Sequence, residues 1–172
     1  MKFFKSAFCA FCFLACFGSV KSVFASASII ATLNAKIAVP ISVTQTSGLN
    51  FGSFAVGASA GTVTVSQAGN SAVGVTLVSG GQARSPGIFA VTGEALGTGT
   101  IPYTFTKPAN VSLTGPSGST AMSATLSFNS GSSARSLSSA GSETVTINST
   151  LSVGANQRAG YYSGIYTVTV AY

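Results

Sequence analysis

One stretch of this 172-residue sequence has the spacing of a catalytic motif, namely Gly57-Ala58-Ser59-Ala60-Gly61. The pattern Gly-x-Ser-x-Gly is typical of the nucleophile elbow of hydrolases, in which a strand-to-helix turn presents a serine hydroxyl to a histidine base. The sequence contains no histidine, and no helix is predicted around this stretch. We therefore interpret the match as a coincidence in a chain rich in glycine, alanine and serine.

The sequence also contains few side chains that could act as a catalytic acid or base or bind a metal ion. The carboxylate side chains are Glu94, in a glycine-rich stretch, and Glu143, at the start of a predicted strand. A catalytic acid–base pair needs two titratable groups placed together, and metal sites need several His, Cys, Asp or Glu ligands. The three cysteines, Cys9, Cys12 and Cys16, all lie close to the N-terminus. We expect no enzyme activity, no cofactor and no metal site.

The first 27 residues are predicted to be a secretory signal peptide. Residues 1–5 carry two lysines, residues 6–20 are largely apolar, and residues 25–27 read Ala-Ser-Ala. These are the charged, apolar and small-residue parts of such a signal, and the apolar run is shorter than the ~20 residues that span a bilayer. Cleavage after Ala27 would leave a single domain of residues 28–172, and cleavage after Ala25 is the alternative.

The fate of the N-terminal segment decides the cysteine content and the net charge of the exported chain. If residues 13–16 instead act as a lipidation box, Cys16 would tether the chain to a membrane, although Phe13 and Leu14 fit that motif poorly. Cleavage after Ala27 removes every cysteine and lowers the net charge from +6 to +3. The remaining cations stand singly, which argues against nucleic-acid binding; they are Lys36, Arg84, Lys107, Arg135 and Arg158.

The strongest periodic pattern follows the predicted signal peptide. Every second residue is apolar, as the series Ile29, Ala31, Leu33, Ala35, Ile37, Val39, Ile41 and Val43 demonstrates. Side chains alternate across a strand, so this series predicts one apolar face on an extended segment over residues 29–43. The segment is two to three times longer than a usual strand, and Pro40 should place it at a sheet edge or bend it.

Shorter strands are predicted further along the chain, separated by turns rich in glycine, serine and proline. Their ranges are 62–66, 72–78, 87–92, 101–106, 121–129, 143–153 and 164–172. About eight strands at this spacing indicate an all-β sandwich or barrel. Half of residues 127–142 are serine, and we interpret that segment as a solvated loop.

Several short motifs carry a resemblance to known families. They are the segment 160–172, Leu49-Asn50-Phe51-Gly52-Ser53-Phe54, and residues 61–65, 92–93, 122–128 and 151–153. Taken together, in their order along the chain, these motifs resemble the bacterial domain-of-unknown-function family numbered 4402, and more distantly the major fimbrial subunits of the Mat/Ecp type. The likeness covers nearly all of residues 28–172.

The fimbrial resemblance implies an immunoglobulin-like antiparallel sandwich of about eight strands, completed by the N-terminal extension of a neighbouring subunit. It also implies a C-terminal strand with a glycine twelve residues before a near-terminal tyrosine; Gly160 and Tyr172 have this spacing, although Tyr172 is the last residue. The subunit contacts implied are Ile29, Ala31, Leu33, Ala35, Ile37, Val39, Gly160, Tyr166, Val168, Val170 and Tyr172. The partners implied are further copies of the chain, a periplasmic chaperone and an usher.

Alternatives stay open at this point. The N-terminal series could be the first strand of a complete monomeric sandwich, and its length favours donation to a neighbour. An exported monomer that binds a glycan or a protein is a second function. A small outer-membrane barrel is a third, because Tyr166, Val168, Val170 and Tyr172 put apolar groups on one face, but most predicted strands are shorter than membrane strands. We expect the chain at the cell surface, in a fimbrium or in the periplasm.

Overall fold

The computed structural model describes residues 26–172. The predicted signal peptide up to Ala25, and the alternative lipidation site Cys16, lie outside these residues. The unit Ile37–Tyr172 is compact, and residues 26–36 belong to a separate unit. No helix in the described part of the chain is long and apolar enough to cross a membrane.

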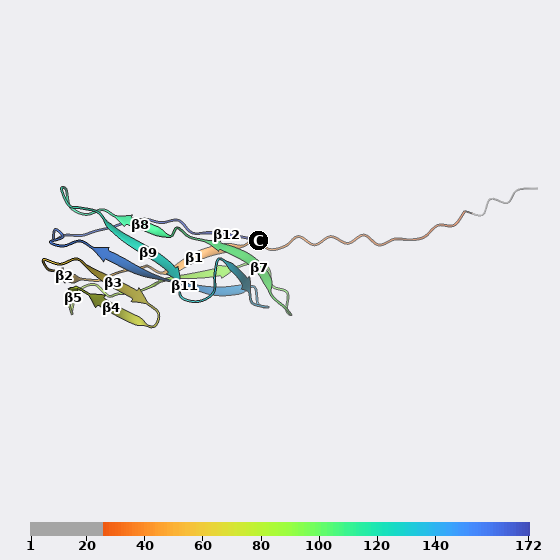
Figure 1. The fold of residues 1–172 in the computed structure, drawn as a ribbon. Helices are drawn as coiled ribbons and strands as arrows, with labels where there is room; N and C mark the ends of the chain where they lie inside the picture. The colour runs from red at the N-terminus through yellow and green to blue at the C-terminus, as the bar shows by residue number, and fades with distance from the viewer. Residues whose placement is uncertain (1–25) are drawn as a thin grey trace, which may run out of the picture. The chain divides into compact units, whose positions relative to one another are not determined.

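The larger sheet is built around its longest strand, β11 (Ser142–Val153). The first half of β11 pairs with β6 (Gly87–Thr92), and its second half pairs with β3 (Gly61–Ser66). The opposite edge of β11 pairs with β9 (Met122–Phe128), because Ile147 is paired to β6 and β9 at once. The outer strands are β1 (Ser42–Ser47) on β6, β4 (Gly69–Val73) on β3 and β8 (Asn110–Leu113) on β9, all antiparallel (Figure 1).

Two smaller antiparallel sheets complete the domain. One has the order β10 (Ala134–Leu137), β7 (Ile101–Thr106), β12 (Thr169–Ala171), so the chain ends at the edge of this sheet. The other pairs β2 (Phe54–Val56) with β5 (Val75–Leu77).

The first core cluster lies between the larger sheet and the β10–β7–β12 sheet. Alternate side chains of each strand point into it, as expected for two packed sheets. Phe105 of β7 is fully buried, and its ring centroid lies 5.8 Å from that of Phe89 of β6 in an edge-to-face arrangement. The other members are Val91, Tyr103, Leu126, Leu137, Val145 and Ile147. The prediction of an all-β antiparallel sandwich is confirmed, with twelve strands in residues 26–172 where about eight were expected.

The second core cluster covers the inner face of β3, β9 and the second half of β11. Its members are Phe51, Val63, Val65, Met122, Ala124, Leu151 and Val153. Ser149 is buried on the same face of β11, and its hydroxyl donates a hydrogen bond of 3.0 Å to the carbonyl of Thr125. A buried polar group is tolerated when it is paired in this way.

Three predicted strands differ from those observed. The segment 29–43 enters the sheet only at Ser42, and residues 26–41 belong to no strand. The segment 72–78 is divided into β4 and β5 by Gly74, whose φ of 73° takes it out of the extended region. The segment 164–172 pairs only over β12, Thr169–Ala171.

The prediction of a solvated loop over 127–142 is wrong for residues 127–128, which end β9, and for residues 134–137. Residues 134–137 form β10, and Leu137 is fully buried in the first core cluster. Arg135 forms an ion pair with Glu143, with 2.9 Å between its Nε and a carboxylate oxygen, and Tyr103 donates a 2.6 Å hydrogen bond to the same carboxylate. The high serine content suggested a loop, but β10 packs against the core through the single large apolar side chain of Leu137.

Candidate functional site

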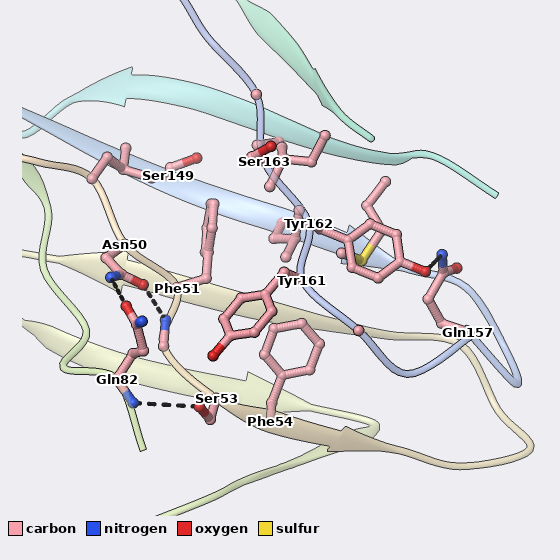
Figure 2. Close-up of a pocket in the computed structure, with 18 of the residues that line it drawn as sticks. Asn50, Phe51, Ser53, Phe54, Gln82, Ser149, Gln157, Tyr161, Tyr162 and Ser163 are labelled. Carbon is pink, nitrogen blue, oxygen red and sulfur yellow. Dashed lines mark hydrogen bonds between the residues drawn. The ribbon is translucent and has the colours of Figure 1, made fainter. Parts of the chain in front are cut away.

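A groove of about 820 Å³ lies over the second core cluster. Its floor is the inner face of β8, β9 and β11, and its two walls are residues 49–56 and the C-terminal residues 157–166 (Figure 2). The floor is apolar apart from the hydroxyl of Ser149, and is made of Val111, Leu113, Met122, Ala124, Leu126, Ser149 and Leu151. We call this cavity the groove.

The backbone of both walls is only sparsely paired. In the first wall Asn50 exchanges hydrogen bonds with Ser85, and β2 pairs with β5 on one side. In the second wall Ser163 forms an isolated bridge to Thr114, after which residues 164–168 belong to no strand. An extended chain placed between the walls would therefore meet peptide groups as well as apolar side chains.

The polar side chains at the groove mainly fix its walls. The Asn50 amide donates to Gln82 at 3.0 Å, and its oxygen accepts the Gly52 N–H at 2.8 Å. On the other wall, Gln157 donates to the hydroxyl of Tyr162 at 2.9 Å, and that hydroxyl donates to a backbone carbonyl. These bonds leave the groove surface itself mostly aromatic and aliphatic.

Aromatic side chains reach the groove from both walls. Figure 2 shows the rings of Phe54 and Tyr161 projecting into it, and Tyr161 is 87% exposed. Tyr166 lies deeper, edge-on to Phe89 with ring centroids 6.4 Å apart, and its buried hydroxyl has no hydrogen-bond partner among residues 26–172. Burial raises the pKa of this hydroxyl, which keeps it neutral.

Glycines allow the C-terminal wall to pass close to its neighbours. A Cβ atom on Gly160 would overlap the ring of Pro116, and one on Gly115 would overlap the ring of Tyr162. Gly160 was predicted as a contact residue, and in the structure it permits the approach of residues 157–166 to the loop after β8. This segment therefore needs glycine at position 160 for packing within the chain.

Residues 28–39, which we call the arm, carry the alternating apolar series. The side chains of Ile29, Leu33 and Ile37 are 92%, 98% and 95% exposed, and Ala31 and Ala35 are exposed as well. Exposed large apolar residues in one short segment are unusual in a soluble protein and mark interaction sites. The alternation predicted for the arm is thus present without the burial that normally accompanies it.

The arm joins the domain at a set of three hydrogen bonds, which we call the clamp. The Val39 N–H donates to Oε2 of Glu94 at 2.7 Å, and the Tyr172 hydroxyl donates to the Val39 carbonyl at 3.0 Å. The same hydroxyl accepts the Glu94 N–H at 2.7 Å. Glu94 is 7% exposed, and Gly93 leaves the space for the hydroxyl because a Cβ there would overlap it.

A family model covers most of the folded unit. The match spans residues 41–172 and its description is "Domain of unknown function (DUF4402)". The chain belongs to the DUF4402 family. Neither the curated proteins nor the solved structures include a significant match to the chain.

The DUF4402 domain brings some of the predicted contact residues together. Tyr166, Val168 and Val170 all pack against the first core cluster, which confirms the alternation of the C-terminal segment. Val39 and Tyr172 meet in the clamp, 133 residues apart in sequence. The arm residues Ile29, Ala31, Leu33, Ala35 and Ile37 form no strand.

The sequence did not indicate that Glu94 and Gly93 contact Val39 and Tyr172 in the clamp. It also did not indicate that residues 49–56 form a wall of the groove. Residues 92–93 and 49–54 are among the motifs of the family resemblance, and that resemblance implies no contact for them. The apolar and aromatic pattern Leu49, Phe51, Phe54 resembles an ordinary strand, and no local signal distinguishes a wall from a core strand.

Among the described residues, no three side chains of His, Cys, Asp or Glu come together as a metal site requires. The groove can bind an extended apolar segment, because it has an apolar floor between two walls whose backbone is sparsely paired.

Proposed function

We propose that this DUF4402 chain is an exported, non-catalytic structural protein of the bacterial surface, a fimbria-like subunit that polymerises by donating its arm to a neighbouring copy. The observation that carries the proposal is the arm itself, whose alternating apolar side chains are almost fully exposed. Burying a leucine or isoleucine side chain contributes about 1.5–3 kcal/mol each, so a partner that covers the arm would be strongly favoured.

The dimensions of the two elements support this pairing. A strand rises about 3.3 Å per residue, so the twelve arm residues span about 40 Å and the eight residues of the first groove wall about 26 Å. The arm is long enough to fill the groove and still reach across to the next domain. Its alternation would place one face on the apolar floor and the other toward solvent.

The proposal includes a periplasmic chaperone and an usher as further partners. A subunit with an exposed apolar arm and an open groove would aggregate during export unless both were covered. The chaperone would cover these surfaces until assembly, and membrane contact would be limited to export.

Charges placed on the arm test the proposal directly. Leu33→Asp and Ile37→Asp should each abolish assembly, because an unpaired carboxylate would enter the apolar groove. Asn34→Asp is the matched control, since it adds the same charge on the other face of the arm and should leave assembly intact. The measurement is the heat-labile ladder of the full chain on gels, together with filaments on cells.

Two results would contradict the proposal. One is an unchanged yield of filaments from both Leu33→Asp and Ile37→Asp. The other is a full-length chain that stays monomeric at every concentration and gives no ladder.

A monomeric binding module is the second candidate. The rings of Phe54 and Tyr161, with Asn50 and Gln82 close by, are of the kinds that bind a sugar face and its hydroxyls (Figure 2). In that case soluble oligosaccharides would bind the monomer, and Tyr161→Ala would weaken binding without any effect of the arm variants.

A further inference from the structure

An apolar arm and an open groove in the same chain could be used in two ways. It could fold back into the groove of its own domain, which would give a closed monomer, or it could enter the groove of a second copy. The two uses bury the same kind of surface and differ in the path of the chain between the arm and β1. That path lies in residues 39–42, within the compact unit.

The clamp fixes the start of this path. Both backbone groups of Val39 are engaged, the N–H by Glu94 and the carbonyl by the hydroxyl of Tyr172. The next two residues are also restricted, because Pro40 has a fixed φ angle and biases Val39 toward an extended conformation, and Ile41 packs on the first core cluster. A tight reversal before Ser42 would have to break these contacts.

The loop that holds the clamp is itself anchored. The Gly93 N–H donates to the carbonyl of Gly141 at 2.9 Å, and the Gly97 N–H donates to the carbonyl of Ser139 at 3.0 Å. Gly141 has a φ of 74° and packs so closely that a Cβ there would lie 2.6 Å from the Gly93 carbonyl oxygen. The backbone on both sides of Glu94 is therefore held by the turn between β10 and β11.

A reversal further out along the arm would consume its apolar residues. A turn at residues 36–38 would leave only residues 28–35 to enter the groove, and Ile37 would be lost from the buried face. The closed monomer would bury less of the apolar series than an exchanged pair of chains.

We propose that the clamp of Val39, Glu94 and Tyr172 directs the arm of each chain into the groove of a second copy and prevents it from filling its own. The inference rests on the proposed function, which supplies the arm as the occupant of the groove. It adds the device that decides between a closed monomer and a polymer, and it identifies Gly93 as a positioning residue.

The test traps the arm in whichever groove it occupies. A chain starting at Ser28 has no cysteine, so Leu33→Cys in the arm and Leu113→Cys on the groove floor would be its only thiols; Ile37→Cys with Leu113→Cys gives a second register. After oxidation, non-reducing gels and intact mass separate links between chains from links within one chain. With the clamp intact we expect links between chains.

The clamp is then opened in two independent ways. Gly93→Ala displaces the Tyr172 hydroxyl by overlap, and Tyr172→Phe removes that hydroxyl and two of the three bonds. Two hydrogen bonds of about 1 kcal/mol net each are removed in Tyr172→Phe, and each ~1.4 kcal/mol is tenfold, so we expect the ratio of links within one chain to links between chains to rise about 30-fold. The same ratio should rise in Gly93→Ala, which disturbs the same two bonds. Gly57→Ala is the control, since a Cβ there meets no atom within 4 Å. Thermal unfolding of each variant verifies that it is folded.

Each outcome decides a separate point. Links between chains that persist unchanged in Gly93→Ala and Tyr172→Phe would overturn the role of the clamp and leave strand donation standing. Links within one chain when the clamp is intact, or no link in either register, would overturn both this inference and the proposed function.

Discussion

The two core clusters of this domain are enclosed to different degrees. Over the first cluster, β12 pairs with β7 and the C-terminal Tyr172 is bonded to the loop after β6. Over the second, the same C-terminal segment carries a single bridge at Ser163, and a groove of about 820 Å³ is present. The C-terminal segment therefore covers the first core cluster where it is paired in a sheet, and it leaves a groove over the second cluster where it is not.

The first prediction compares Phe105, a member of the first cluster, with Phe54, which packs against the second. Phe105→Ala should lower the free energy of unfolding by about 4 kcal/mol, because the ring is fully buried and contacts two other rings. Phe54→Ala, on the wall of the groove, should cost about 1–2 kcal/mol, since that side chain is only partly buried. Denaturant unfolding of both measures the difference, and equal losses would contradict it.

The second prediction concerns the ion pair beside the first cluster. Glu143→Ala leaves Arg135 and the Tyr103 hydroxyl without their shared partner, and should cost about 3 kcal/mol. Arg158→Ala, at the groove, removes a single bond to the carbonyl of Ser117 and should cost less than about 1 kcal/mol. Denaturant unfolding measures both losses. Equal losses would mean that the Arg135–Glu143 pair stabilises the domain no more than the Arg158–Ser117 contact does.

The third prediction probes the tight packing of the groove wall. Gly160→Ala should cost about 1–3 kcal/mol, because the new methyl group overlaps Pro116 and must move the wall. Gly57→Ala has open space and should change stability by less than about 0.5 kcal/mol. If Gly160→Ala unfolds at the same denaturant concentration as the parent chain, the wall is not held by this contact.

The fourth prediction is a pH dependence that originates in the first cluster. Burial and the hydrogen bond to Glu143 raise the pKa of Tyr103 well above its usual value of about 10. Above about pH 10 the unfolded chain loses this proton while the folded chain keeps it, so the free energy of unfolding falls as pH rises, by at most ~1.4 kcal/mol per pH unit. Tyr103→Phe should make the decline between about pH 10 and pH 11 less steep.

The buried Tyr166 has a raised pKa as well and should sustain part of the decline in the Tyr103→Phe variant. Lys107 acts with the opposite sign, because burial lowers its pKa, and its share is the same in both chains. An identical slope in the parent chain and the variant would contradict the role assigned to Tyr103.

Much of the sandwich could be predicted from the sequence because it depends on local alternation. The strands at 87–92 and 101–106 have the predicted bounds, since each combines alternating apolar residues with flanking turns. The strand at 134–137 could not be found this way. Its docking depends on Leu137 meeting a cluster formed by distant strands, and on Arg135 meeting Glu143.

The candidate site was predictable only at its two ends. The apolar series of the arm and the C-terminal alternation are visible in the sequence, and Gly160 and Tyr172 are spaced as the resemblance implies. The clamp was not, because it joins Val39 to Glu94 and Tyr172 across 55 and 133 residues, and neither contact leaves a local pattern. The groove depends on where backbone pairing stops, which side-chain periodicity does not report.

The clamp also has a mechanical consequence. A pull on the arm is transmitted at Val39 to β1, which continues the chain, and through hydrogen bonds to Glu94 and to the hydroxyl of Tyr172. β1 lies along β6, and β12 lies along β7, so tension on one point is shared at once by both sheets. The side chain of Tyr172 thus connects the start of the folded unit mechanically to its end.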